Sequence, residues 1–250
     1  LMRGRLRSTF RLSGVALHLA YGLCIATLLY PLLPHSSRKQ LQQRWSNRLL
    51  GILGVNLQVS GTTCRHGLLV ANHVSWLDVF VISSIAPATF VCKSEVRHWP
   101  LIGLLCARTD TVFLERGSRT AAQRVNQTLA GKLRNGEQVA VFPEGTTSSG
   151  VSLLAFRAAL LQSAIDAETD VQPLALRYRD ALGVNATAAH YCGETTLWQS
   201  LLAIAAAPRI TASVEILEKL ATADKTRSEL CEQAQALIGS CLEQRSAAYS

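Results

Sequence analysis

The stretch GLLVANHVSWLD, residues 67–78, joins a short apolar run to a histidine and an aspartate five positions apart. The run has the length and composition of a buried strand, and the polar residues follow where such a strand would turn into a helix. In an unbroken helix, side chains five residues apart point about 140° away from each other. His73 and Asp78 therefore meet only if His73 lies on the turn and the helix begins near Ser75.

Three interpretations of this corner follow from the residues. Asp78, three positions after a Ser75 N-cap, would complete a capping box, which is a purely structural role. Alternatively, Asp78 accepts a hydrogen bond from one imidazole nitrogen of His73 and leaves the other nitrogen open to take a proton. Imidazole changes charge near neutral pH, which suits a general base. A nucleophilic Ser75 is the third interpretation, but no G-x-S-x-G turn surrounds it.

From residue 55 onward, short β-rich runs alternate with helical patterns. The expected strands are 55–60, 67–72, 88–93, 110–115, 138–142, 171–178 and 209–217. The expected helices are roughly 75–86, 99–107, 119–134, 151–165, 194–206 and 223–244. This alternation predicts an α/β fold with a mixed, largely parallel sheet flanked by helices. Functional loops of such sheets gather at the carboxyl ends of the strands.

The N-terminal segment differs in character. Four arginines (Arg3, Arg5, Arg7 and Arg11) precede the apolar run 12–34, which as a helix of about 35 Å could cross a hydrocarbon core of roughly 30 Å. Basic residues also follow the run, so the positive-inside rule selects no orientation. The next segment has Leu41, Trp45, Leu49 and Ile52 at helical spacing, a pattern typical of a helix in the membrane interface. We expect residues 1–54 to form a membrane-associated helical hairpin that dips into one leaflet, with a true span as the alternative, and residues 55–250 to form the main domain.

Composition narrows the class of partner. The chain is 48% hydrophobic and carries a formal net charge of +8, which favours an anionic membrane surface. Only 6% of its residues are aromatic and no basic-aromatic motif stands out, so nucleic acid is not expected. The seven cysteines show neither CxxC spacing nor pairing with histidine. They are interpreted as reduced thiols of a cytoplasmic protein without a metal site.

A second polar loop, FPEGTTSSG, follows the expected strand 138–142. Pro143 and Gly145 fit a sharp turn, and the hydroxyls of residues 146–148 would stand beside a helix beginning near Val151, an arrangement that suits an anionic or polar headgroup. Glu144 at the strand end needs a cation or a polar ligand, and Arg116 in VFLERGSR could be that cation. A capped turn and a solvated arginine are the structural alternatives.

Together these loops resemble the glycerolipid acyltransferase family typified by bacterial 1-acylglycerol-3-phosphate acyltransferases. NHVSWLD matches the NHxxxxD block of the family at Asn72, His73 and Asp78. VFLERGSR resembles the second block with Phe113 and Arg116, VFPEGTTS matches the third at Phe142, Pro143, Glu144 and Gly145, and VQPLAL resembles the fourth with Pro173. The four blocks fall in the family's order over residues 70–176.

The resemblance implies transfer of a fatty acyl group from acyl-CoA or acyl carrier protein to a lysolipid hydroxyl at the cytoplasmic face of an inner membrane. Membrane lipids would be its partners, and no cofactor would be needed beyond the acyl donor. By the same resemblance, His73 acts as general base and Asp78 orients its ring. The implied substrate-binding residues are Asn72, Phe113, Arg116, Glu144, Gly145 and Thr146.

The acceptor is less strongly indicated. Many family members that use a phosphate acceptor have arginine after EGT, where this chain has Thr147. Retention of Arg116 favours 1-acyl-sn-glycerol-3-phosphate, and the alternative is lyso-ornithine lipid, whose acyltransferases the form FPEGTTS resembles more closely. Two other classes remain open: a non-catalytic lipid-binding protein, and a thioesterase in which water replaces the lysolipid.

Overall fold

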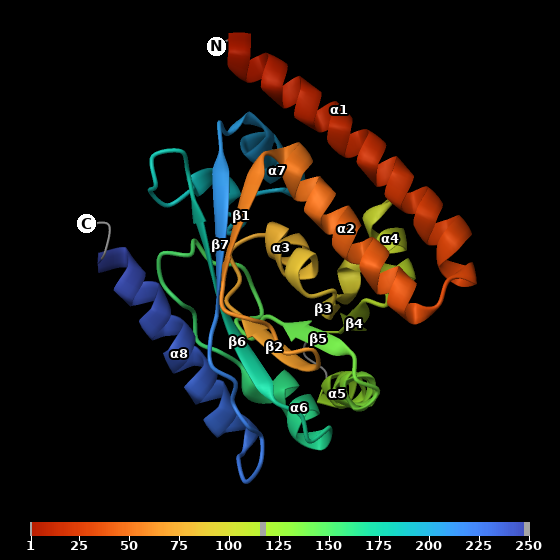
Figure 1. Ribbon diagram of the computed structural model, residues 1–250, viewed down its shortest axis with the longest axis vertical. Helices are drawn as coiled ribbons and strands as arrows, with labels where there is room; N and C mark the ends of the chain where they lie inside the picture. Colours follow the sequence, from red (N-terminus) through yellow and green to blue (C-terminus); the bar gives the residue numbers. More distant parts are fainter. Residues whose placement is uncertain (1, 116–118, 248–250) are drawn as a thin grey trace.

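The protein is built on a seven-stranded sheet with the order β1-β7-β6-β2-β5-β3-β4 (Figure 1). The structure is a computed structural model that describes residues 2–115 and 119–247. The strands are β1 (Val55–Ser60), β2 (Gly67–Ala71), β3 (Thr89–Lys93), β4 (Val112–Leu114), β5 (Gln138–Val141), β6 (Val171–Arg179) and β7 (Ile210–Ile216). Every predicted strand is present within two residues of its predicted bounds, and the predicted mixed, largely parallel sheet is confirmed.

Strand direction determines which loops meet. Of the six strand pairs in the described chain, five are parallel and one, β6 with β7, is antiparallel. The five strands from β2 to β6 therefore point the same way, and their carboxyl ends lie along one edge of the sheet. The loops that follow β2 and β5, which carry the motifs at residues 72–78 and 142–148, leave the sheet at this edge.

The central strand β2 accounts for the apolar run from which the fold can be predicted. All five of its residues are buried. Because side chains alternate along a strand, Leu69 and Ala71 join one hydrophobic cluster, whereas Leu68 and Val70 join a second cluster on the opposite face. A strand covered on both faces has to be apolar at every position, as strands of parallel sheets usually are.

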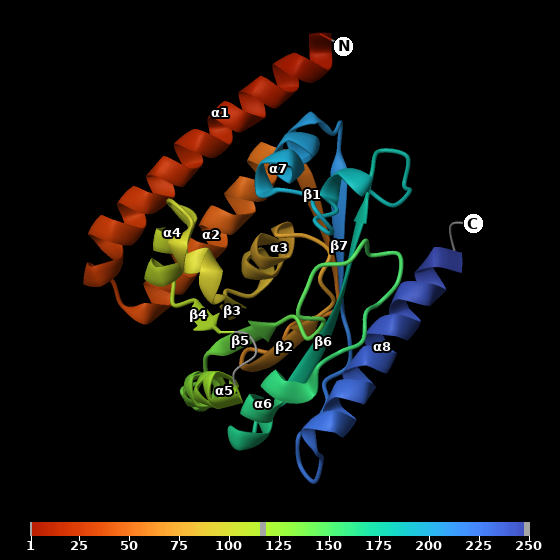
Figure 2. The ribbon, with the colours of Figure 1, turned by 180° about the vertical axis from the view of Figure 1, so that it is seen from behind.

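Helices provide that cover. They are α1 (Met2–Cys24), α2 (His35–Leu53), α3 (Leu77–Ile85), α4 (Ile102–Arg108), α5 (Arg119–Arg134), α6 (Gln162–Asp166), α7 (Leu197–Ala206) and α8 (Arg227–Ala247). α2, α3 and α7 lie on one side of the sheet with α1 outermost, and α8 lies on the other side (Figures 1 and 2). α5 has the predicted bounds, and its apolar stripe of Val125, Leu129 and Leu133 is buried.

One predicted helix is partly wrong. Residues 151–157 are irregular, and helical turns begin only at a 3₁₀ turn, Ala158–Leu161, which leads into α6. The main-chain N–H groups of this segment donate to distant acceptors instead of to the preceding turn: Leu154 to the Glu144 carboxylate at 3.2 Å, Phe156 to the Gln235 side chain at 2.7 Å and Arg157 to the Pro143 carbonyl at 2.9 Å. The hydroxyls of residues 146–148 therefore do not stand at a helix N-terminus as predicted.

The N-terminal helices form the predicted hairpin. After α1 the chain passes through a π turn, Ile25–Leu29, and a 3₁₀ turn, Tyr30–Leu32, before α2 runs back. The His18 ring stacks on the Trp45 indole with ring centroids 4.7 Å apart. Each of these two side chains also hydrogen-bonds the other's main-chain carbonyl, at 2.9 and 3.2 Å. Gly22 allows this close approach, because a Cβ there would lie 2.5 Å from Trp45 Nε1.

The expected interfacial position of α2 is not what the structure shows. Leu49, Leu50 and Leu53 are at most 2% exposed and belong to the same buried cluster as β2. Trp45 lies between the rings of His18 and Phe80. The apolar stripe of α2 is therefore part of the protein core, since α3 and the sheet cover the face that we expected to meet lipid.

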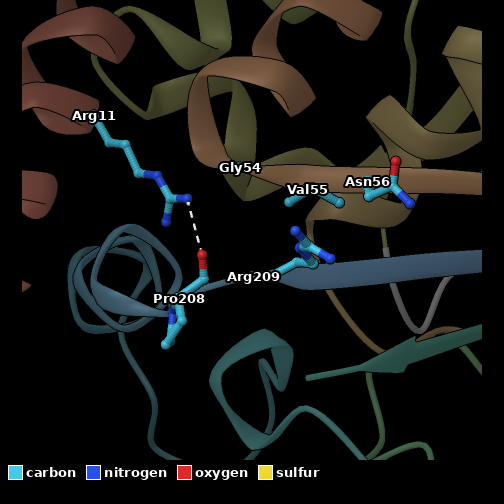
Figure 3. A pocket seen from close by; sticks show the side chains of 6 residues that line it. All are labelled: Arg11, Gly54, Val55, Asn56, Pro208 and Arg209. Atoms are coloured by element: carbon cyan, nitrogen blue, oxygen red, sulfur yellow. Dashed lines mark hydrogen bonds between the residues drawn. The ribbon is translucent and has the colours of Figure 1, made fainter. Parts of the chain in front are cut away.

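α1 is held along its length by the rest of the protein. Arg11 donates to the carbonyl of Ala207, the C-cap of α7, at 2.6 Å, which satisfies an acceptor left open at the end of that helix. It also donates to the carbonyl of Pro208 at 3.5 Å (Figure 3). Arg7 donates to the Ala206 carbonyl in the same way. At the other end of the helix, α1 packs against α4.

The opposite face of α1 is apolar and exposed. The helical stretch Gly4–Leu32 has the length and composition of a membrane-crossing helix, and only 22% of its most apolar window is buried. The exposed side chains on this face are Leu6, Phe10, Leu17, Tyr21 and Leu28. α1 thus has one face packed on the protein and one face available to an apolar environment.

Replacing Gly22 with alanine is expected to destabilise the hairpin. The new methyl group would overlap the Trp45 indole, and overpacking of this kind costs about 1–3 kcal/mol. Denaturant unfolding of the purified protein measures the effect. Gly51→Ala in α2 is the matched control, because no atom lies within 4 Å of a Cβ at that position. Equal free energies of unfolding for the two variants would contradict the close packing of α1 on α2.

Candidate active site

The motif loops converge beyond the carboxyl ends of β2 and β5. His73 lies two residues after β2, and Glu144 lies three residues after β5. The loops are joined directly, since the Ser148 N–H donates to the His73 carbonyl at 2.8 Å. Residues that are about 70 positions apart in the sequence thus form one site.

Asp78 organises the corner after β2. Its carboxylate is fully buried, and Oδ2 accepts three hydrogen bonds: from His73 Nδ1 at 2.8 Å, from the Val74 N–H at 2.7 Å and from the Ser75 N–H at 3.0 Å. Oδ1 accepts a hydrogen bond from the Tyr178 hydroxyl at 2.6 Å. Asp78 therefore both orients the histidine and holds the turn that leads into α3, so the structural and catalytic interpretations of this corner are compatible.

Ser75 does not cap α3 in the predicted way. The helix begins at Leu77 with Trp76 at its N-cap, and the Ser75 Oγ, which is fully buried, has no hydrogen-bond partner among the described residues. The main-chain N–H of Ser75 does bond Asp78, which is the other half of a capping box. The buried hydroxyl is poorly placed to meet a substrate.

The His73 ring is fixed by contacts on two sides. Its Nδ1 is bonded to Asp78, and its plane stacks on Phe142 with centroids 4.0 Å apart and an interplanar angle of 12°. The His73 side chain is 19% exposed, and Nε2 has no hydrogen-bond partner among the described residues. A hydrogen bond from Nδ1–H to the carboxylate leaves Nε2 as an acceptor at the surface of the site.

Glu144 joins the two loops through its carboxylate. It is 3% exposed; Oε1 accepts from the His73 N–H at 2.6 Å and Oε2 from the Leu154 N–H at 3.2 Å. Burial raises the pKa of Glu144, and the two main-chain donors oppose that rise. Both carboxylate oxygens of Glu144 thus accept hydrogen bonds from the main chain. These N–H groups stand where we expected a cation or a polar ligand from the sequence.

Asn72 extends the sheet by one pair of hydrogen bonds. Its side-chain amide donates to the Leu176 carbonyl at 3.0 Å and accepts from the Leu176 N–H at 2.8 Å. This pairing imitates a strand and fastens the end of β2 to β6. Asn72 is 2% exposed, so its amide supports the corner from inside.

The remaining predicted site residues lie in different surroundings. Gly145 adopts a φ of +68° at the turn, and Thr146 is exposed. Phe113 is in β4 at the sheet edge, where the Arg97 guanidinium lies 4.5 Å from its ring centroid. Arg116 lies outside the described residues. Among the described residues, no group of three or more His, Cys, Asp or Glu side chains could hold a metal ion.

Two residues that were not predicted complete the site. Tyr178 in β6 donates to Asp78, and Tyr191 bridges the loops, because its N–H donates to the Val74 carbonyl at 3.1 Å and its carbonyl accepts from Thr147 Oγ1. Tyr178 closes the run VQPLALRY, and a tyrosine in an otherwise apolar strand is a sign of a buried hydroxyl that needs a partner. Nothing in the sequence indicates which partner that is.

Asn72→Ala is expected to lower the free energy of unfolding by roughly 2–4 kcal/mol, because it leaves the buried N–H and carbonyl of Leu176 unpaired. Denaturant unfolding tests this expectation, with the exposed Asn56→Ala of β1 as control. A loss no larger than that of the control would mean that Asn72 does not fasten β2 to β6.

Glu144 should impose a pH dependence on stability. Because its pKa is raised in the folded state, its contribution is fully present at pH values below the ordinary pKa of a glutamate and is lost as the pH rises through the raised pKa. The free energy of unfolding of Glu144→Gln relative to the wild type should therefore increase as the pH rises from the ordinary pKa of a glutamate, about 4.3, through the raised pKa. Glu194→Gln, at an exposed position, should show no such trend. Curves for wild type and Glu144→Gln that stay parallel over this range would contradict the burial of an ionisable Glu144.

Comparisons with known proteins agree with this geometry. The acyltransferase family model matches residues 56–177, which include His73, Asp78 and Glu144 and end one residue before Tyr178. A lyso-ornithine lipid O-acyltransferase from Pseudomonas aeruginosa is 38% identical over 242 residues, which cover 95% of this chain and 92% of that protein. A 1-acyl-sn-glycerol-3-phosphate acyltransferase from Neisseria gonorrhoeae is 39% identical over 186 residues, or 72% of this chain and 70% of that protein.

The fold also matches a solved structure. The crystal structure of the 1-acyl-sn-glycerophosphate acyltransferase PlsC from Thermotoga maritima superposes with a TM-score of 0.73, covering 98% of this chain and 97% of that chain. The two sequences are 20% identical, so this match concerns the fold alone. With a relative 38% identical along nearly the whole chain and a family model that matches residues 56–177, the protein belongs to the acyltransferase family.

Proposed function

We propose that this acyltransferase moves a fatty acyl group from a thioester donor, acyl-CoA or acyl carrier protein, to the free hydroxyl of a lysolipid. The observation that carries the proposal is the His73–Asp78 pair: a 2.8 Å bond holds Nδ1 while Nε2 is open to a substrate. Bases of this kind typically contribute 10²–10⁴-fold to a rate.

The reaction then needs no nucleophile from the protein. His73 Nε2 takes the proton of the lysolipid hydroxyl as its oxygen attacks the thioester carbonyl, and the charge of Asp78 stabilises the imidazolium that forms. Collapse of the tetrahedral intermediate forms the ester, breaks the carbon–sulfur bond and returns the proton from His73 to the departing thiolate. Donor and acceptor have to be bound together, so much of the acceleration comes from positioning.

Lyso-ornithine lipid is the acceptor that we place first. The relative that spans 95% of the chain carries that activity in its name. At Thr147, where many phosphate-using members have arginine, the side chain bonds the Tyr191 carbonyl and supplies no cation. A zwitterionic headgroup demands less positive charge from the site than a phosphomonoester, whose charge is about −1.5 to −2 at neutral pH.

1-Acyl-sn-glycerol-3-phosphate is the second candidate acceptor, and two observations favour it. The Neisseria gonorrhoeae relative with that name is 39% identical over 186 residues. The exposed guanidinium of Arg157 also lies beside the turn at residues 143–145, with Nη1 3.7 Å from the position that a Cβ on Gly145 would take. Arg157 offers a positive charge that is suited to a phosphate or a carboxylate.

We propose that α1 lies within one leaflet of an inner membrane, at its cytoplasmic face. Its buried face contacts α2, α7 and α4 along the whole helix, so a crossing helix would have to carry these elements with it into the bilayer. Its exposed apolar face suits an in-plane position, and the net charge of +8 suits an anionic surface. Acyl-CoA and acyl carrier protein are cytoplasmic donors, which favours that face.

Acyl transfer by the purified full-length protein in lipid vesicles tests the proposal. The labelled acyl group is supplied either as acyl-CoA or as its thioester with acyl carrier protein. Each donor is offered with lyso-ornithine lipid and with lysophosphatidic acid in parallel. We expect kcat/KM at least about tenfold higher for lyso-ornithine lipid, and a loss of about 10²–10⁴-fold in His73→Ala. His66→Ala, a change of an exposed histidine just before β2, should keep full activity.

Each alternative function has its own outcome in this assay. Transfer only to lysophosphatidic acid would reverse the order of the acceptors. Fatty acid release without a lysolipid would identify a thioesterase. Lipid binding with no transfer, unchanged in His73→Ala, would identify a non-catalytic lipid-binding protein and contradict the proposed function.

A further inference from the structure

The hydroxyl of Tyr178 donates a hydrogen bond in the interior of the site. Tyr178 is 2% exposed, and its O–H donates to Asp78 Oδ1 at 2.6 Å. Burial and the neighbouring charge of Asp78 raise the pKa of Tyr178 well above its ordinary value. Because this shift favours the neutral phenol, the hydroxyl is a donor to the carboxylate.

This hydrogen bond restricts rotation of the Asp78 carboxylate about its last side-chain torsion. The other three donors, from His73, Val74 and Ser75, all bind Oδ2 and come from one short turn. Oδ1 accepts its hydrogen bond from Tyr178, on a different strand. An aspartate side chain rotates easily about its last torsion, so donors on both oxygens fix the plane of the carboxylate, whereas donors on one oxygen leave it able to turn.

Tyr178 also connects the histidine corner to a distant part of the chain. It lies 100 positions after Asp78, in the long strand β6 beside β2. Leu176, two residues earlier on the same strand, pairs through its main chain with the Asn72 amide. β6 therefore holds both ends of the segment from Asn72 to Asp78, through the main chain of Leu176 at one end and the side chain of Tyr178 at the other.

We propose that Tyr178 is a positioning residue that fixes the Asp78 carboxylate and, through it, the His73 ring for proton transfer. The inference rests on the proposed function, because it concerns the histidine that accepts the hydroxyl proton. The hydroxyl has no path to the substrate of its own, since Asp78 and the strand enclose it. Its effect should therefore appear in the rate and in its pH dependence, and not in lysolipid binding.

Tyr178→Phe removes the hydroxyl and keeps the ring. We expect kcat to fall about 10- to 100-fold, by analogy with the loss of a hydrogen-bond partner behind a metal-ligating side chain, while KM for the lysolipid changes less than about twofold. Without the Tyr178 donor, more negative charge stays on the Asp78 carboxylate, which then stabilises the imidazolium of His73 more strongly. The acidic limb of the kcat profile should therefore move to higher pH.

The matched control is Tyr30→Phe. Tyr30 is also buried and its hydroxyl donates to the Arg38 carbonyl at 3.2 Å, at the end of the N-terminal hairpin. This variant should keep the wild-type kcat and pH profile. A double-mutant cycle with Asp78→Asn adds a second test: if Tyr178 acts through Asp78, Tyr178→Phe should cost nothing further once the carboxylate is gone.

If Tyr178→Phe does not fold, 3-fluorotyrosine incorporated at position 178 keeps the ring and strengthens the donor. The acidic limb should then move to lower pH, in the opposite direction. An unchanged kcat and pH profile in a folded Tyr178→Phe, or an unchanged profile in the fluorotyrosine protein, would overturn the inference while leaving acyl transfer by the wild type intact. A wild type that transfers no acyl group would instead overturn the proposed function, and the inference with it.

Discussion

The buried carboxylate of Asp78 is the interaction on which the rest of the site depends. A charge placed in the protein interior is costly unless donors surround it, and here four donors do so: one imidazole, two main-chain N–H groups and one phenol. To collect them, the chain has to turn sharply after β2, begin α3 close by and bring β6 alongside. The requirement that keeps the carboxylate stable in the core thus also aims the His73 ring toward solvent.

The buried and the exposed polar groups of the site have different roles. Glu144 and Asn72, which resemble substrate-binding residues in the sequence, have their polar atoms bonded to the main chain of His73, Leu154 and Leu176. They position the histidine loop, and the open Nε2 of His73 is left to meet the substrate. Under the proposed function, the acceptor would then be selected by the exposed rim, which includes Thr146 and Arg157.

Sequence patterns succeed here where a local rule is sufficient. Every strand could be predicted from a short run of apolar and β-branched residues between turn residues. In β2 the signal is strongest, because a strand covered on both faces is apolar at every position. These patterns fail where a hydrogen-bond or packing partner far away in the sequence determines the local structure. Residues 151–157 have a helical composition, yet Glu144, Gln235 and Pro143 take their N–H groups. The stripe of α2 suits lipid equally well, but α3 covers it, and the partner of Tyr178 is 100 positions away.

Under the proposed function, the Asp78–His73 pair activates the lysolipid hydroxyl for direct attack on the thioester, without an acyl-enzyme. Initial rates measured over a matrix of donor and lysolipid concentrations test it most directly. Direct attack requires both substrates to be bound at once and predicts double-reciprocal lines that intersect. Parallel lines, the mark of a ping-pong reaction through a covalent intermediate, would contradict direct attack and would point to a nucleophile supplied by the protein.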